Sequence, residues 1–374
     1  MNTAKPSVRR VGRNETTLWG MSSAERVRRI ATAAALPIDD EGRQSPQLLV
    51  DLGYAFDPLW LAHLAGRPGA VLTLGGRAVI AHVGDPAVAD MVAAAMAHGD
   101  ALPDGTALEV IAFETGGRIY NTALRKLEQP FVERLEPDSV RAIERKSYQG
   151  AYKGVTDILT KYLWPQWAFL LTRVAARIGI SPNGVTAIGA VLCVIATLLF
   201  WRGDYWPGLA AGLAFMVLDT VDGKLARCTI TSSWWGNIFD HGMDLIHPPF
   251  WWFAWAVGLG AWGLAFTPTI FWAVQAILFA GYVLQRLIEG AFIKAFGMHI
   301  HVWRKCDSDF RLVTARRNPN MAILFFAMLF ARPDIGLLAV TGWTVLSLLV
   351  HAVQFIQAAA ARRRGETLTS WLAG

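Results

Sequence analysis

The chain has 374 residues, a hydrophobic share of 53%, 16 tryptophans and a formal net charge of +6. This apolar content exceeds that of an ordinary soluble domain and favours an integral membrane protein with more than one domain. The positive charge is not arranged as a basic stripe interleaved with aromatic residues. We therefore expect basic loops at a membrane surface and no nucleic acid partner.

Residues 1–45 are polar and basic, and we expect them to form a lead-in with one short helix over residues 22–35. The helix would begin at SSAE, which has the sequence of an N-terminal cap. The opening residues lack the apolar core of a signal peptide, so the N-terminus is expected in the cytoplasm.

Residues 46–145 alternate between short strand-like and helix-like segments, which predicts a small cytoplasmic α/β domain. The expected strands are LLVDLGY, AVLTLGG, RAVIAHV and LEVIAF, and the expected helices are AFDPLWLAHLAG and DPAVADMVAAAMAH. Asp51 and Asp57 are either metal ligands or, in the interpretation that we favour, turn and capping residues.

Residues 150–180 mix basic side chains with tryptophan and phenylalanine, as expected of an amphipathic helix that lies in the membrane interface. Apolar runs over 181–360 then predict six transmembrane helices, followed by a cytoplasmic tail over 361–374. The expected spans are residues 183–201, 207–226, 237–258, 269–292, 319–332 and 335–359. Basic residues concentrate in the loop before the fifth span and after the sixth, which places both ends of the domain in the cytoplasm.

Four aspartates lie in this apolar region, where an unpaired charge is costly. Asp219 and Asp222 stand three residues apart, and Asp240 and Asp244 stand four apart, so each pair shares one helix face. Carboxylates that converge from two helices repel one another unless cations neutralise them, and oxygen ligands favour hard ions such as Mg²⁺ or Mn²⁺. The sequence therefore predicts a divalent metal site that faces the cytoplasm.

The residues around the aspartates complete the pattern D-x2-D-G-x2-A-R-x8-G-x3-D-x3-D, in which the other fixed positions are Gly223, Ala226, Arg227 and Gly236. This pattern resembles the signature of the CDP-alcohol phosphotransferase family, and every fixed position is matched. The resemblance implies a six-helix membrane enzyme of phospholipid biosynthesis, with two divalent ions on Asp219, Asp222, Asp240 and Asp244. It also implies that Asp244 is the general base and that Arg227 adds positive charge as CMP leaves. A homodimer is expected from the family.

Ahead of the first span lies SPNGVT, with Asn183 and Thr186. One interpretation is a helix start with a capping residue before proline. The other interpretation is that Asn183 and Thr186 contact the donor nucleotide, since relatives carry a similar stretch beside it. Four signature residues would contact the donor as well, namely Gly223, Ala226, Arg227 and Gly236.

Two groups of polar residues near the later spans have open interpretations. Arg286 and Glu289 form either a structural pair or part of a wet cavity, and we favour the pair slightly. Arg311, Arg316 and Arg317 either orient the loop or, with Arg286, bind a phosphate on the acceptor. We interpret His299 and His301 as ordinary loop histidines.

The expected donor is CDP-diacylglycerol, and the expected acceptor is an alcohol such as inositol or an inositol phosphate. The alternative is a polar donor such as CDP-inositol, which would be joined to a second alcohol or a lipid. Residues 46–145 resemble the later part of a sugar-nucleotide transferase domain, as in the inositol phosphate cytidylyltransferase/di-inositol phosphate phosphate synthase type. We interpret this region as a degenerate, non-catalytic copy. Rival classes are a divalent-metal or polar-solute transporter and a membrane anchor, neither of which explains the whole motif.

Overall fold

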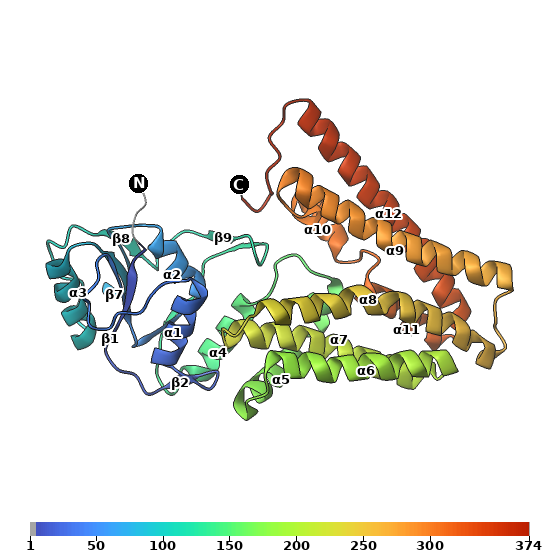
Figure 1. The fold of residues 1–374 in the computed structure, drawn as a ribbon, viewed down its shortest axis with the longest axis horizontal. Helices are drawn as coiled ribbons and strands as arrows, with labels where there is room; N and C mark the ends of the chain where they lie inside the picture. The colour runs from blue at the N-terminus through green and yellow to red at the C-terminus, as the bar shows by residue number, and fades with distance from the viewer. Residues whose placement is uncertain (1–4, 374) are drawn as a thin grey trace.

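The computed structural model describes residues 5–373, except the side chains of Asn237 and Asp240. An N-terminal α/β unit precedes a helical unit, and the two lie side by side along the long axis of the molecule (Figure 1). The chain passes from the α/β unit to the helical unit through α4, Val140–Gly150.

The α/β unit is built on a mixed five-stranded sheet in the order β1-β4-β7-β6-β8. Strands β1 and β4 are parallel, as are β6 and β8, whereas β7 is antiparallel to both of its neighbours. The bounds are β1 Ser7–Val11, β4 Gln47–Asp51, β6 Ala70–Leu74, β7 Arg77–Val83 and β8 Glu109–Ala112. The strands expected from alternation are all present, and β1 is an addition. Residues 7–33 therefore belong to the folded unit, and the expectation of a polar lead-in over 1–45 was wrong there.

Alternating side chains of the strands bury both faces of the sheet. Leu48 and Val50 contact α1 (Ser23–Ala33) and α2 (Pro58–Ala65) on one face. Leu49 points to the other face and packs against α3 (Pro86–His98). The result is three layers, with the sheet between its helices (Figure 1).

The helices of this unit begin at side chains that satisfy free backbone N–H groups. Ser22 caps α1 by accepting from the N–H of Glu25, as the SSAE sequence predicts. Asp57 accepts from the N–H of Leu59 at 2.9 Å and caps α2, and Asp51 accepts from the N–H of Gly53 at 2.7 Å. Both aspartates thus have the turn and capping roles that we favoured.

Three short two-stranded ribbons complete the α/β unit. They are β2 (Thr17–Leu18) with β3 (Met21–Ser22), β5 (Tyr54–Phe56) with β11 (Val132–Arg134), and β9 (Ile119–Asn121) with β10 (Lys126–Glu128). The β2–β3 ribbon docks on α4, where the indole N–H of Trp19 donates to Ser147 at 2.8 Å. A shared apolar cluster continues from Trp19 to Val221 and Leu225 of the helical unit, so the two units have a packed interface.

The helical unit contains six helices at the places where six spans were expected. They are α6 Pro182–Arg202, α7 Tyr205–Cys228, α8 Trp234–Gly258, α9 Pro268–Phe296, α11 Arg317–Leu329 and α12 Pro333–Arg363. In the described part of the chain, α6, α9 and α12 are long and apolar enough to cross a membrane. A count of six spans stays a prediction, because α11 is short and α7 carries the charges of the motif.

The expected interfacial helix is divided into two pieces. A single π-helical turn covers Leu159–Leu163, and Pro165 begins α5, Pro165–Ile178. One face of α5, with Ala168 and Ala175, packs into the shared cluster. The opposite face exposes large apolar side chains at helical spacing, namely Trp167, Leu170, Leu171, Val174 and Ile178. A helix with an outward apolar face is suited to contact lipid.

Short elements close the helical unit. They are the 3-10 turns Leu259–Trp262 and Ile300–Val302, and α10, Lys305–Arg311. The C-terminal tail folds back onto this loop, where the hydroxyl of Ser370 donates to the carbonyl of Val302 at 2.8 Å.

Candidate metal and phosphate site

The signature residues lie where α7 ends and α8 begins, beside the first turn of α6. Ser233 caps α8 by accepting from the N–H of Gly236 at 3.0 Å. A Cβ atom on Gly236 would lie 2.9 Å from Oδ1 of Asn183 in α6. Glycine at this position therefore allows the starts of α6 and α8 to approach closely.

Asp222 is buried and held by partners on two sides. The hydroxyl of Thr186 donates to its Oδ2 at 2.6 Å, and the N–H of Gly223 donates to its Oδ1 at 2.5 Å. The side chain of Thr186 comes from α6, so this contact fixes α7 against α6. Both Asn183 and Thr186, predicted as nucleotide contacts, thus lie at the signature.

Asp219 and Asp244 are brought together by one guanidinium. Nη2 of Arg317 is 2.6 Å from Oδ2 of Asp219, and Nη1 is 2.7 Å from Oδ1 of Asp244. The side chain of Asp219 is 16% exposed, whereas that of Asp244 is 48% exposed. The aspartates of α7 and α8 therefore converge on one position that favours positive charge, and Asp244 is open to a small molecule.

The remaining signature aspartate, Asp240, lies on α8 one turn before Asp244, but its side chain is outside the described residues. The donor set of the others consists of carboxylate oxygens, which fits a hard divalent ion. The guanidinium of Arg317 occupies the position between two of these carboxylates. The residues present therefore fit the metal that the signature implies.

Arg227 lies against the backbone of the segment that follows α4. Its Nε donates to the carbonyl of Ala151 at 2.9 Å, and its guanidinium lies 3.2 Å from the place where a Cβ on Gly223 would be. Gly223 thus leaves room for the arginine. Next to it, the buried amine of Lys224 lies over the ring of Tyr152, a contact that sequence reasoning missed.

A second missed contact ties α11 to the segment before α5. Nδ2 of Asn318 donates to Oδ1 of Asp157 at 3.0 Å and to Oγ1 of Thr160 at 3.1 Å. Asn318 follows Arg317 directly, so this network positions the guanidinium that bridges the aspartates. Asn318 and Asp157 are 161 residues apart, and no local pattern marks their contact.

The other arginines predicted for the acceptor lie elsewhere. Nη2 of Arg316 donates to both carboxylate oxygens of Glu289, at 2.6 and 2.5 Å, and Nη1 of Arg286 donates to Oε2 at 3.2 Å. The favoured Arg286–Glu289 pair is therefore present. Arg311 is buried, and its Nε and Nη1 have no hydrogen-bond partner in the described part of the chain. Burial lowers the pKa of Arg311.

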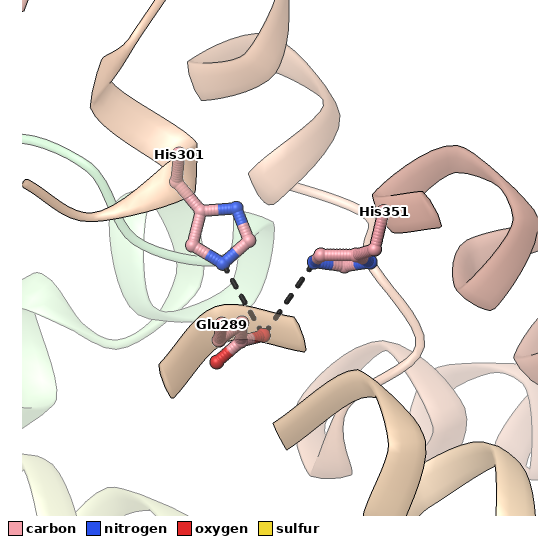
Figure 2. A group of neighbouring side chains, drawn as sticks. All are labelled: Glu289, His301 and His351. Atoms are coloured by element: carbon pink, nitrogen blue, oxygen red, sulfur yellow. Dashed lines mark ion pairs between the residues drawn. The ribbon is translucent and has the colours of Figure 1, made fainter. Parts of the chain in front are cut away.

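Glu289 is the centre of a cluster that sequence reasoning missed. The Nε2 atoms of His301 and His351 each lie 3.5 Å from its Oε1 (Figure 2). His301, interpreted as an ordinary loop histidine, is 2% exposed, and His351 is fully buried. The sequence signal available was polar residues inside apolar helices, at 289 and 351.

The fold and the site together define an integral membrane protein of mainly helical fold with an acidic cluster between α7 and α8. Residues 179–350 match the family model described as CDP-alcohol phosphatidyltransferase. This match identifies residues 179–350 as similar to the CDP-alcohol phosphotransferase family.

Three relatives show how the similarity is distributed. Cholinephosphotransferase 1 of Gallus gallus is 31% identical over 31% of this chain and 36% of its own length. Phosphatidylinositol phosphate synthase of Streptomyces avermitilis is 34% identical over 23% of this chain and 34% of its own length. Choline/ethanolaminephosphotransferase 1 of Arabidopsis thaliana is 31% identical over 41% of each chain. The chain thus spans about a third of the length of the curated relatives that it matches.

Proposed function

We propose that this protein transfers a substituted phosphate group from a CDP-linked donor to an alcohol and releases CMP. The observation that carries the proposal is the convergence of Asp219 and Asp244 on one position of positive charge. The complete signature and the match of residues 179–350 to the family model support it.

Asp219, Asp222, Asp240 and Asp244 would hold two divalent ions, Mg²⁺ or Mn²⁺. When bound, these ions neutralise charge on the diphosphate and on the leaving CMP. Thr186 keeps the carboxylate of Asp222 turned toward α6. Arg227 adds a fixed positive charge beside Gly223.

Asp244 is the proposed general base, and its exposure supports this role. Its carboxylate accepts the proton of the acceptor hydroxyl, and the oxygen forms a bond to the phosphorus that carries the donor alcohol. The bond from that phosphorus to CMP breaks, and CMP leaves with the electron pair.

The nucleotide would lie by Asn183, Thr186, Gly223, Ala226, Arg227 and Gly236. Arg286, Arg311, Arg316 and Arg317 would lie toward the acceptor. Arg311 is the best supported of these as an anion ligand, because two of its buried N–H groups have no partner among the described residues. The remaining arginines already contact carboxylates.

Our first choice of donor is CDP-diacylglycerol, with inositol or an inositol phosphate as acceptor. The name of the Streptomyces avermitilis relative supports this choice. The alternative is a polar CDP-alcohol that is joined to a second alcohol or a lipid, and the relatives named cholinephosphotransferase support it.

We place the protein in the inner (cytoplasmic) membrane as a homodimer, with the site and the α/β unit toward the cytoplasm. We propose that the α/β unit, a degenerate nucleotidyltransferase-like domain, is a scaffold.

The test is CMP release by the purified protein with Mg²⁺ or Mn²⁺. CDP-diacylglycerol with inositol or inositol phosphate is compared with CDP-choline and CDP-inositol, each with diacylglycerol. Asp244→Asn is expected to retain donor binding and to abolish release. Asp204→Asn is the matched control, because Asp204 lies at the opposite end of α7.

Turnover by Asp244→Asn would refute the role of Asp244 as base. Absence of CMP release with every donor would refute the transferase. Metal or solute uptake into vesicles by the same preparation would then establish the rival class, a transporter.

A further inference from the structure

Three potential metal ligands meet in the cluster around Glu289, away from the signature aspartates. Glu289 comes from α9, His301 from the 3-10 turn that follows it, and His351 from α12 (Figure 2). One ligand atom of each lies within 4.8 Å of the others. Both histidines are buried, so their ring nitrogens cannot rely on bulk water for partners.

The hydrogen bonding of His351 determines which of its nitrogens faces the cluster. Nδ1 lies 2.7 Å from the carbonyl oxygen of Ser347. A carbonyl only accepts, so Nδ1 carries a proton, and Nε2 of the neutral ring presents a lone pair. That lone pair faces Oε1 of Glu289, and Nε2 has no hydrogen-bond partner among the described residues. Two acceptors that face each other in a buried place need a cation or a proton between them.

His301 lies at the same distance from the same oxygen, and its ring has Arg316 as a further neighbour. Its Nε2 lies 3.5 Å from Oε1 of Glu289 and 3.3 Å from Nη2 of Arg316. Since a guanidinium only donates, Nε2 is the acceptor in this contact and is not protonated. The Nε2 atoms of both histidines therefore lie beside one carboxylate oxygen, and that of His301 also accepts from Arg316.

The distances match metal coordination better than hydrogen bonding. Both nitrogen–oxygen separations are 3.5 Å, beyond the usual N–H···O range of about 2.7 to 3.2 Å. Zinc bonds of about 2.0 to 2.2 Å in a tetrahedral arrangement place neighbouring ligand atoms about 3.4 Å apart. Two histidines and one glutamate are also a ligand set that zinc uses with its fourth position open.

The arginines beside Glu289 are distributed unequally over its two oxygens. Arg316 reaches both carboxylate oxygens, and Arg286 reaches Oε2. Metal binding at Oε1 would therefore require Nη2 of Arg316, which lies 2.6 Å from this oxygen, to move onto Oε2. The Nδ1–H of His351 on Ser347 is the outer contact that fixes a metal-ligating imidazole.

We propose that Glu289, His301 and His351 bind one transition-metal ion of the zinc class, separate from the divalent ions of the aspartates. The ion would join α9, the 3-10 turn and α12 at one point. It would therefore stabilise the loop that leads into α11.

The test uses the full-length protein in detergent, stripped with a chelator and kept in saturating Mg²⁺ to occupy the aspartates. Titration with Co²⁺ is expected to give the visible absorption of four-coordinate cobalt at one equivalent, with loss on addition of Zn²⁺. His351→Gln and His301→Gln are expected to remove the absorption. His299→Gln, an exposed residue of the same loop, and Asp244→Asn are expected to retain it.

Two outcomes would overturn the proposal. One is a wild-type protein that binds no cobalt or zinc and shows no rise in its thermal unfolding temperature with Zn²⁺. This measurement needs no variant, so it decides the matter even if the histidine variants fail to fold. The other is equal cobalt binding by the folded His351→Gln and His301→Gln proteins. A metal-free cluster in which His351 is protonated and paired with Glu289 would give the first outcome.

Discussion

Replacing Thr186 by valine would remove one hydrogen bond and keep the shape of the side chain. The hydroxyl of Thr186 donates at 2.6 Å to Oδ2 of Asp222, which is 3% exposed. A hydrogen bond to a charged group contributes about 1.5 to 3 kcal/mol, or roughly a 10- to 150-fold change in an equilibrium constant. An outer partner of a metal ligand has an effect of about the same size, 10- to 100-fold in metal affinity. We therefore expect Thr186→Val to raise the Mg²⁺ concentration for half-maximal CMP release by at least about tenfold.

The matched control is Thr197→Val on the same helix. Thr197 donates to the backbone carbonyl of Cys193 at 2.8 Å and touches no aspartate in the described structure. Mg²⁺ titrations of CMP release by the two variants and the wild type form the assay. Equal Mg²⁺ requirements for Thr186→Val and Thr197→Val would refute the reasoning. A raised KM for the donor with an unchanged Mg²⁺ requirement would assign Thr186 to the nucleotide instead.

Two further predictions concern stability. Burial raises the pKa of Asp51 to about 6, whereas an unfolded aspartate titrates near 4. The folded state therefore holds the proton of Asp51 more tightly than the unfolded state. The resulting loss of stability grows as the pH rises from about 4 to 6 and stays at about 3 kcal/mol above that range. In denaturant titrations, Asp51→Asn should raise the free energy of unfolding at pH 7.5 and leave it unchanged at pH 4. A lower free energy of unfolding for the variant at pH 7.5 would contradict the expected direction. In the helical unit, a Cβ on Gly258 would overlap the carbonyl oxygen of Phe200, so Gly258→Ala should cost about 3 kcal/mol or more. Gly260→Ala, which meets nothing within 4 Å, is the control, and equal thermal unfolding temperatures for the two would contradict the close crossing of α6 and α8.

Local patterns were sufficient to predict most of the helices and strands. Period-two alternation around Leu48 and Leu49 predicts β4, and a serine or aspartate cap marks the starts of α1, α2 and α3. Strand β1 was not predicted, because its sequence SVRRV contains two arginines. It lies at the edge of the sheet, where it pairs on one side only. The β propensity of an edge strand depends on the strand that it pairs with, and the sequence of the edge strand alone does not contain this information.

The site was predictable where spacing along one helix carries the chemistry. The pairs Asp219–Asp222 and Asp240–Asp244 follow helical spacing, and the signature names their family. The contact of Thr186 with Asp222 and the bridge of Arg317 join different helices, and no spacing rule relates them. The cluster at Glu289 draws on three elements, so it emerges only from the packing of α9 against α12.

Arg316 and Arg317 are neighbours in the chain, yet each serves a different carboxylate cluster. Arg316 holds Glu289, and Arg317 holds Asp219 and Asp244. The peptide unit that joins them, at the start of α11, therefore positions the arginines of both clusters, and a shift of that backbone would move both guanidiniums. A substitution that displaces the start of α11 is therefore expected to disturb both clusters at once.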